Sequence, residues 1–355
     1  MAKRKLLLKH HLCPGDVACT TTLVRDLYKQ YGHEVEIGFD TNQKAIYKHN
    51  PYVKPMLASA ADVETIVLCY KDGLTSSKNG NRHHFLTWFY RDFNKKSGLD
   101  VTCTQSWPDL HLSEEQRRVS PIEGRYWLIF AGGKTDFTVK WWDPVRYQTV
   151  ADNLRTFGLR FAQSGATKPS KPQNVQPKMN NVLDLLGWGS VEEFLWQVYH
   201  AEGVICPITA AMHIAAGFRK PAVVVAGGRE EWWWEAYTND GQFPKTADDV
   251  TVPHKYLHTQ GMLECCLTAG CHKNKVIKMN DDKRICTMPA ARRVGQSPLP
   301  TCMDMITVDH VVNAVLSYYE SGLLPPIGLE QAKMRDWYLS NGKGRLMPDN
   351  VRFAK

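Results

Sequence analysis

The sequence lacks an apolar run long enough to cross a membrane. A spanning helix needs about 20 consecutive apolar residues, whereas the longest runs here are short, at 126–131 and 222–226. The basic start, Met1 to Lys5, is followed by only three leucines before Lys9, and an export signal needs an apolar stretch of about 7–15 residues. These absences predict a soluble, cytoplasmic protein.

Two common nucleotide-binding fingerprints are also absent. The chain contains neither G-x-x-x-x-G-K-[ST] nor G-x-G-x-x-G, which argues against an ATPase and against an ordinary NAD enzyme. It has no internal repeat and no low-complexity tract, so a solenoid is excluded. With 355 residues, 43% of them hydrophobic, the chain fits two globular domains and excludes a small disulfide-stapled scaffold.

Positive charge is in excess. The chain has 44 Lys and Arg against 36 Asp and Glu, a formal net charge of +8. Such a balance favours anionic partners, among them phosphates, sugar nucleotides, nucleic acid and acidic membrane headgroups. The charge by itself does not choose among them.

Short apolar runs alternate with segments of helical spacing in both halves of the chain, which is typical of βα units on a parallel sheet. The pattern predicts strands at 5–8, 34–37, 65–69, 100–102, 126–130, 159–163, 203–206 and 222–226, and helices at 17–31, 84–96, 144–157, 191–201, 210–217, 308–321 and 329–339. Two such domains bind ligands in the crevice between them, at the carboxyl ends of strands. The loops after strands are therefore where chemistry is expected.

The first of these loops carries Asp16, in the sequence Pro14-Gly15-Asp16-Val17. An aspartate at the start of a helix caps the backbone N–H groups and complements the helix dipole. A carboxylate held between two domains can also serve as a general base. Spacing alone leaves both interpretations open.

Two loops of the second half have features of an anion site. Gly132 and Gly133 follow a strand and precede Lys140, so that backbone amides and a cation could meet a phosphate. Thr209 stands where a helix N-cap belongs, and the free N–H groups of that helix attract a diphosphate. His213 lies one turn further on, either facing the ligand or satisfied within its own domain.

Another candidate lies in an aromatic run. Glu231 precedes three tryptophans, 232–234, after the strand end at Gly228. Such rings can stack on a nucleotide base while the carboxylate binds ribose hydroxyls, or they can pack the irregular segment around them. We place Glu231 among the candidate donor-binding residues.

Five of the ten cysteines gather in one irregular segment, 258–305. Cys266, Cys271, Cys286 and Cys302 could hold a structural zinc ion, which accepts Cys and His ligands. Buried free thiols are the alternative that we favour, because no C-x-x-C pair recurs. Disulfides are the third possibility, which a reducing cytoplasm disfavours.

Three motifs together resemble those of a known family. They are Gly15-Asp16-Val17 with Thr20 to Thr22, Ala131-Gly132-Gly133 with Lys140-Trp141-Trp142, and Thr209-Ala210-Ala211-Met212-His213. In this order and spacing they look like the signatures of the heptosyltransferase family of glycosyltransferases, family nine. The resemblance implies an α/β protein of GT-B fold, with two Rossmann-like domains whose parallel sheets face a central cleft. It places the acceptor domain at 1–123, the nucleotide-sugar domain at 124–326, and a closing segment, 327–355, packed back on the first domain.

The resemblance also implies roles for residues. Asp16 falls on the catalytic base, Lys140 on the lysine that contacts the donor diphosphate, and Thr209, Ala210 and His213 on the donor-site loop. Ile208 departs from the pattern, because the family usually has an aspartate immediately before the threonine.

The function implied is inverting transfer of a sugar, without a required metal or other cofactor, from a nucleotide-sugar donor to a hydroxyl of a glycan or lipopolysaccharide-type acceptor. Two alternatives stay open. A DNA glycosyltransferase acting on a hydroxymethylated base fits the positive charge and would need base flipping. A non-catalytic nucleotide-sugar or nucleic-acid binding protein of the same fold is suggested by Ile208.

Overall fold

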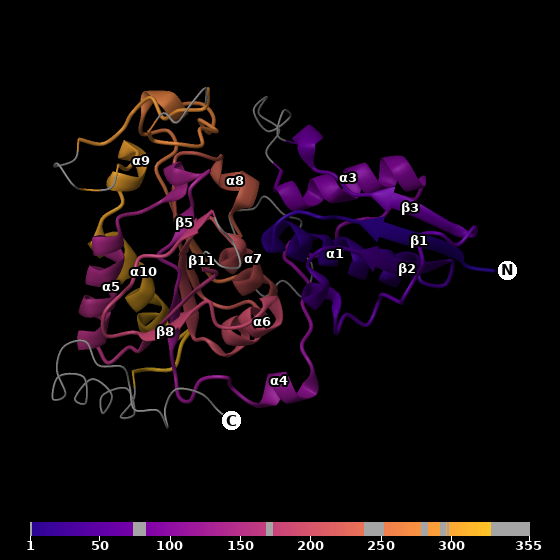
Figure 1. The fold of residues 1–355 in the computed structure, drawn as a ribbon, viewed down its shortest axis with the longest axis horizontal. Coiled ribbons are helices and arrows are strands. Elements are labelled where there is room, and N and C mark those ends of the chain that lie inside the picture. Colours follow the sequence, from indigo (N-terminus) through magenta and orange to yellow (C-terminus); the bar gives the residue numbers. More distant parts are fainter. Residues whose placement is uncertain are drawn as a thin grey trace.

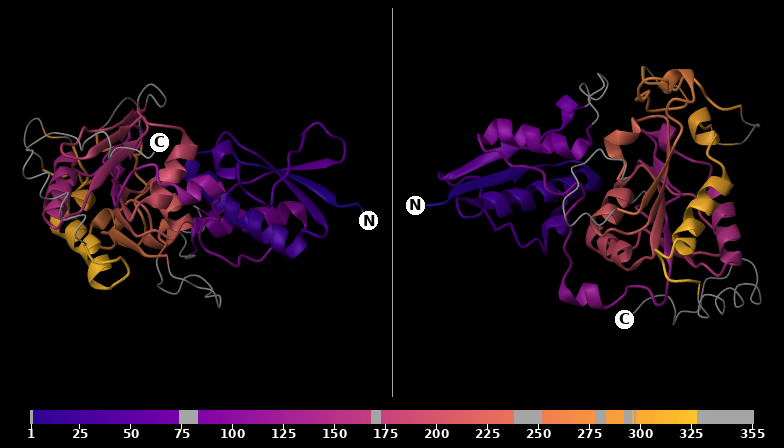
Figure 2. Two further views of the ribbon diagram at one scale, coloured as in Figure 1. Left: turned by 90° about the horizontal axis from the view of Figure 1, so that it is seen from below. Right: turned by 180° about the vertical axis from the view of Figure 1, so that it is seen from behind.

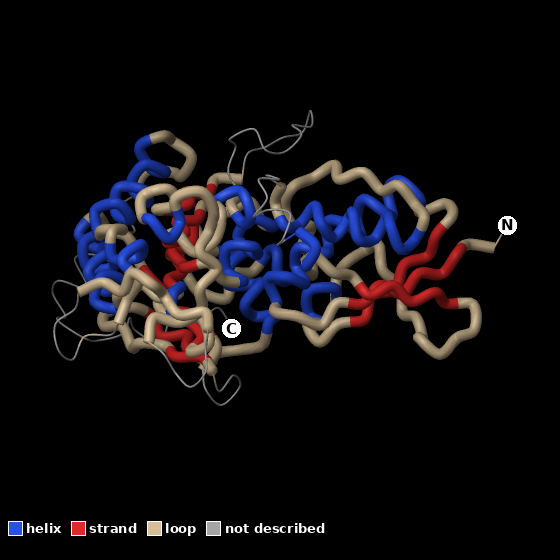
Figure 3. Tube along the Cα trace, turned by 90° about the horizontal axis from the view of Figure 1, so that it is seen from above, coloured by secondary structure: helices blue, strands red, loops and turns tan. Residues whose placement is uncertain are grey.

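The computed structural model describes residues 2–73, 83–167, 173–237, 252–277, 283–291, 296 and 298–327. Two separate parallel sheets form the framework, with helices between them and around them (Figures 1 and 3). The expected helix at 329–339 and its packing on the first domain lie outside the described residues. The division of the chain at residue 123 stays a prediction.

The first sheet has three parallel strands in the order β2-β1-β3. They are β1 (Arg4–Lys9), β2 (Val35–Asp40) and β3 (Val63–Val67), and the helices α1 (Pro14–Tyr31) and α3 (Phe85–Ser97) pack against each other beside them. The prediction of a strand at 100–102 is wrong. Side-chain amides take the place of a neighbouring strand there: Asn94 Oδ1 accepts the N–H of Val101 at 3.0 Å, and Gln30 Oε1 accepts that of Thr102 at 2.9 Å.

The second sheet has six parallel strands in the order β11-β10-β9-β4-β6-β8. They are β4 (Trp127–Ile129), β6 (Phe161–Gly165), β8 (Leu183–Leu186), β9 (Gly203–Pro207), β10 (Ala222–Gly227) and β11 (His254–His258). Its central strands are buried on both faces, as β9 and β10 show at every position, and this explains their continuous apolar runs.

Helices cover both faces of this sheet. α5 (Pro144–Thr156) and α10 (Val308–Glu320) pack together on the outer face, while α6 (Val191–His200) and α7 (Ala210–Gly217) lie on the face toward the first sheet (Figures 1 and 2). The core beneath α6 and α7 is continuous with the core of the first sheet. The contact of α1 with α7 therefore joins the two halves of the molecule.

Short elements complete the fold. They are η1 (Lys44–Tyr47), α4 (Glu114–Arg118), η2 (Thr138–Lys140), α8 (Trp232–Glu235), η3 (Glu264–Cys266), α9 (Thr301–Asp304), and the antiparallel pair β5 (Gly133–Lys134) and β7 (Asn174–Val175). The sequence pattern did not predict β11, which pairs with β10 just before the cysteine-rich segment. Within the described part of the chain, no helix has the length and apolar character to span a membrane.

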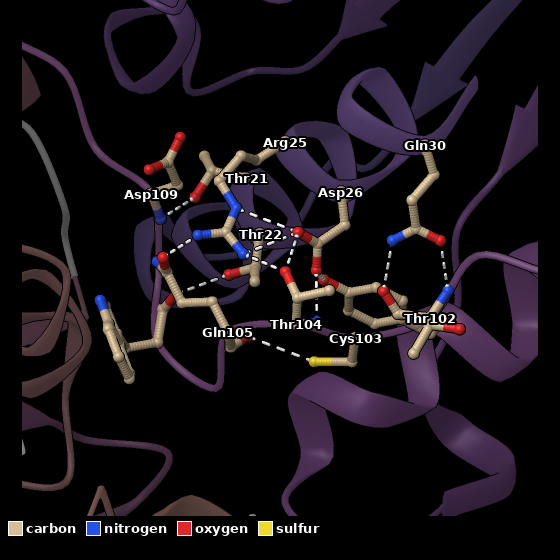
Figure 4. Close-up of polar contacts among 12 residues, drawn as sticks. Thr21, Thr22, Arg25, Asp26, Gln30, Thr102, Cys103, Thr104, Gln105 and Asp109 are labelled. Carbon is tan, nitrogen blue, oxygen red and sulfur yellow. Dashed lines mark hydrogen bonds and ion pairs between the residues drawn. The ribbon is translucent and has the colours of Figure 1, made fainter. Parts of the chain in front are cut away.

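A buried polar network fixes α1 in place (Figure 4). The carboxylate of Asp26 is fully buried and pairs with Arg25 at 2.6 Å. It also accepts hydrogen bonds from the Tyr90 hydroxyl at 2.7 Å and from the backbone N–H of Thr104 at 2.8 Å. A buried charge with this many partners holds its surroundings in one arrangement. The network thus fixes the helix whose first turn carries Asp16.

Candidate active site

The first turn of α1 packs against the first turn of α7. Gly15 faces Ala210 and His213 so closely that a Cβ atom on Gly15 would lie 2.6 Å from His213 Cδ2 and 3.2 Å from Ala210 Cα. Both distances are shorter than ordinary van der Waals contact, so only glycine fits this position without a shift. Two of the three motifs found in the sequence are thereby brought into direct contact.

Asp16 does not cap α1. The helix begins at Pro14, its N-cap residue is Cys13, and no side chain caps it. Asp16 is therefore the third residue of the helix, within the first turn, and the cap interpretation of its role is wrong. The carboxylate still complements the helix dipole from that position.

The carboxylate of Asp16 lies among groups from both halves of the molecule. Burial and the nearby carboxylate of Glu235 raise its pKa above the ordinary value, against a hydrogen bond from Tyr70 and the charges of His10 and Lys140. Tyr70 follows β3, whereas Glu235 and Lys140 belong to the second half. A carboxylate with a raised pKa and a hydrogen-bond partner is a candidate general base.

Lys140 ends η2 and is mostly buried. Its Nζ lies 3.0 Å from Glu230 Oε1, and burial lowers its pKa to about 8. The nearby carboxylates of Glu235 and Asp16 oppose that shift. The structure thus brings Lys140 and Asp16, which the sequence analysis selected separately, into electrostatic contact.

Thr209 is the N-cap of α7, as expected. Its hydroxyl accepts the N–H of Ala211 at 3.4 Å. His213, one turn further on, is buried, with Nδ1 2.8 Å from the Tyr237 hydroxyl and Nε2 3.9 Å from Glu235 Oε2. Burial lowers the pKa of His213 to about 3, so the imidazole is neutral at physiological pH.

Close packing explains why Gly132 and Gly133, which follow β4, are glycines. A Cβ atom on Gly132 would overlap the side chain of Gln176, and one on Gly133 would overlap the indole of Trp141. Gly133 also forms the short antiparallel pair with Val175. The role of both glycines in binding a donor phosphate stays a prediction.

Glu231 is fully buried, unlike the partly exposed Glu235 of the same run. Its Oε2 lies 3.0 Å from His272 Nε2, while its Oε1 has no hydrogen-bond partner among the described residues. The predicted contact with the donor is untested.

Sequence reasoning missed Glu235 and Tyr70. Glu235 ends a four-residue helix, too short for a periodic pattern, in a run where the tryptophans drew attention. Tyr70 offered a usable signal, because it follows a strand of the first sheet as Asp16 does.

All ten cysteines are free, which removes the disulfide alternative. Cys265, Cys271 and Cys286 are close enough to Cys302 to raise its pKa, after the larger effect of burial. In the part of the chain that the structure describes, no three Cys, His, Asp or Glu side chains are arranged to hold a metal ion.

A family model described as glycosyltransferase family 9 (heptosyltransferase) matches residues 66–243. The chain belongs to glycosyltransferase family 9. No curated protein matches its sequence. The resemblance drawn from the three motifs is confirmed, and membership makes the chain a nucleotide-sugar-dependent glycosyltransferase.

Solved structures of this family share the fold. A family 9 glycosyltransferase from Veillonella parvula superposes with a TM-score of 0.58 at 13% identity, over 89% of this chain and 98% of that one. The Escherichia coli ADP-heptose lipopolysaccharide heptosyltransferase II gives 0.54 at 13%, over 90% and 100%. The iron-containing dodecameric glycosyltransferase TibC of enterotoxigenic E. coli gives 0.58 at 15%, over 90% and 77%. The expected GT-B fold is confirmed.

Proposed function

We propose that this family 9 enzyme transfers a sugar, with inversion, from a nucleotide-sugar donor to a hydroxyl of a glycan or lipopolysaccharide-type acceptor. The observation that carries the proposal is the meeting of Asp16, from the first half, with Lys140 and the start of α7, from the second, around the Gly15–His213 contact. A base and an anion site from opposite halves are what a direct displacement requires.

In the proposed reaction the acceptor hydroxyl attacks the anomeric carbon from the side opposite the diphosphate. Asp16 accepts the hydroxyl proton while the new C–O bond forms and the bond to the diphosphate oxygen breaks. Lys140 and the positive end of the α7 helix dipole stabilise the charge that gathers on the diphosphate. One displacement of this kind inverts the anomeric centre.

The proposed donor is an ADP-linked heptose. Two similar structures support it, one described as an ADP-heptose heptosyltransferase and one as TibC in complex with ADP-D-β-D-heptose, the latter with a TM-score of 0.53 at 14% identity. Donor-site residues proposed here are Lys140, Thr209, Ala210 and His213, with Gly132, Gly133 and Glu231 as the further candidates from sequence.

No metal is assigned to the reaction. TibC is described as iron-containing, and thiolates of Cys266, Cys271, Cys286 and Cys302 are ligands that iron or zinc accepts. The described residues do not fit such an ion, because no three potential ligands converge. We treat the cysteine segment as a scaffold of the second domain.

The test is transfer itself. The full chain is incubated with ADP-heptose, or with ADP-glucose or UDP-glucose for comparison, and release of nucleoside diphosphate is measured with and without acceptor. Lipopolysaccharide inner-core oligosaccharide and hydroxymethylated duplex DNA serve as competing acceptors, and NMR gives the anomeric configuration of the product. If only DNA stimulates the release of nucleoside diphosphate, the acceptor is DNA and not a glycan. If no donor releases nucleoside diphosphate, the proposal is overturned.

A further inference from the structure

A second cation lies beside Lys140. The Lys140 ammonium is 5.9 Å from the centroid of the Phe137 ring, and the Arg229 guanidinium carbon is 5.1 Å from the same centroid. Both cations pair with one carboxylate oxygen, Oε1 of Glu230. Neither Arg229 nor Glu230 was predicted as a site residue from the sequence.

The cysteine-rich segment fixes Arg229. The Arg229 Nε donates to the carbonyl oxygen of Lys273 at 2.6 Å, and Nη2 donates to Asn274 Oδ1 at 3.2 Å. The carbonyl of Asn274 in turn accepts the N–H of Val139 at 3.2 Å, next to Lys140. One stretch of the segment therefore holds both cations in place.

The hydrogen bonding of this cluster is incomplete. Glu230 is only 5% exposed, and its second oxygen, Oε2, has no hydrogen-bond partner among the described residues. Two cations face one carboxylate, and Arg229 is itself 91% buried. Cations that share one carboxylate oxygen keep further N–H donors, which the phosphate oxygens of a ligand can accept from. Glu235, which also lies near Asp16, is the next carboxylate close to Arg229.

We propose that Arg229 and Lys140 together bind the diphosphate of the donor, and that Glu230 is the internal counter-ion with which the diphosphate competes. This rests on the proposed function, which supplies the diphosphate. Arg229 binds phosphate oxygens in a forked geometry that Lys140 cannot offer. Asn274 is a positioning residue, because it orients Arg229. The cysteine-rich segment, which takes no part in the chemistry, thereby gains a role as the support of the donor site.

The experiment measures binding of ADP, AMP and inorganic pyrophosphate to the full chain by calorimetry. Arg229→Gln is expected to weaken ADP and pyrophosphate about 10-fold to 100-fold, the ratio equivalent to about 1.5–3 kcal/mol for a charged hydrogen bond. AMP, which lacks the second phosphate, is expected to lose less. Asn274→Ala is expected to weaken ADP more than AMP, as Arg229→Gln does. Glu230→Gln is expected to bind ADP and pyrophosphate more tightly.

Arg146→Gln is the matched control, because Arg146 pairs with Asp304 at 2.8 Å on the outer helix α5. It should leave ADP affinity unchanged, and thermal melting checks that every variant is folded. A folded Arg229→Gln protein that binds ADP as wild type does overturns the inference, and weaker ADP binding by Glu230→Gln overturns the role of the counter-ion. Failure of the wild type to bind ADP, UDP, GDP or CDP would instead overturn the proposed function, and the inference with it.

Discussion

Replacing Asp16 by Asn tests the proposed base most directly. Asparagine keeps the size of the side chain and an oxygen that can accept the hydrogen bond from Tyr70. It cannot accept a proton from the attacking hydroxyl. General-base catalysis contributes about 10²-fold to 10⁴-fold in rate, which corresponds to about 2.7–5.4 kcal/mol of activation free energy. We expect kcat to fall by that factor while the KM for the donor changes little.

The thermal stability of this variant, unlike its rate, should not fall. Burial raises the pKa of Asp16 above its ordinary value of 3.8. For such a group the stabilisation is complete below the ordinary pKa and is lost as the pH rises through the raised pKa. Asparagine stays neutral, so Asp16→Asn should melt at the same or a higher temperature than wild type at pH 7.

The assay follows nucleoside diphosphate release and thermal melting in parallel. Asp62→Asn is the control, because Asp62 is an exposed carboxylate that pairs with Lys5 at 2.7 Å, before β3. A structural role for Asp16 would lower both the rate and the melting temperature. The reasoning is refuted if Asp16→Asn keeps its rate within a few-fold of wild type, or if it loses rate only because it unfolds.

Three further changes probe the same site. Tyr70→Phe removes a hydrogen bond that lowers the pKa of Asp16, so the acidic limb of the kcat/KM profile should move to higher pH. The rate should fall about 2-fold to 10-fold, which is equivalent to the contribution of one hydrogen bond, about 0.5–1.5 kcal/mol. An unchanged limb would show that the hydroxyl does not act on the base. Lys140 has a pKa of about 8, so wild-type kcat/KM should decline as the pH rises through that value, and Lys140→Arg should abolish the decline; a basic limb that persists belongs to another group. Gly15→Ala places a methyl group 2.6 Å from a carbon of His213 and should cost about 1–3 kcal/mol in urea unfolding, whereas wild-type stability would mean that α1 and α7 separate freely.

The strands that the sequence predicts best are those buried on both faces. β9 and β10 are continuous apolar runs, and both were predicted to within a residue of their observed ends. β8, with the sequence LDLL, and β11, with the sequence HKYLH, were missed. These two form the edges of the sheet. An edge strand is specified by the neighbour it pairs with, which lies far away in the sequence, more than by its own composition.

The candidate site divides in the same way. Asp16 and Thr209 lie at the start of a helix, and Lys140 follows the strands β4 and β5 closely in the sequence, so that local sequence carries the signal. Glu235 and Arg229 matter because of what they contact across the fold. Neither contact has a fixed spacing in sequence, so no local pattern could have predicted it.

The departure at Ile208 also changes meaning once the structure is considered. Ile208 is buried in the core shared by the two halves, where an ionised carboxylate without a partner would be strongly disfavoured. A carboxylate is nevertheless present near His213, because Glu235 lies 3.9 Å from its Nε2 and also affects Asp16 and Lys140. The departure therefore does not remove the negative charge from this region. Glu235 of α8 supplies this negative charge in place of the residue before Thr209. Lys140 therefore still has acidic groups around it that balance its charge.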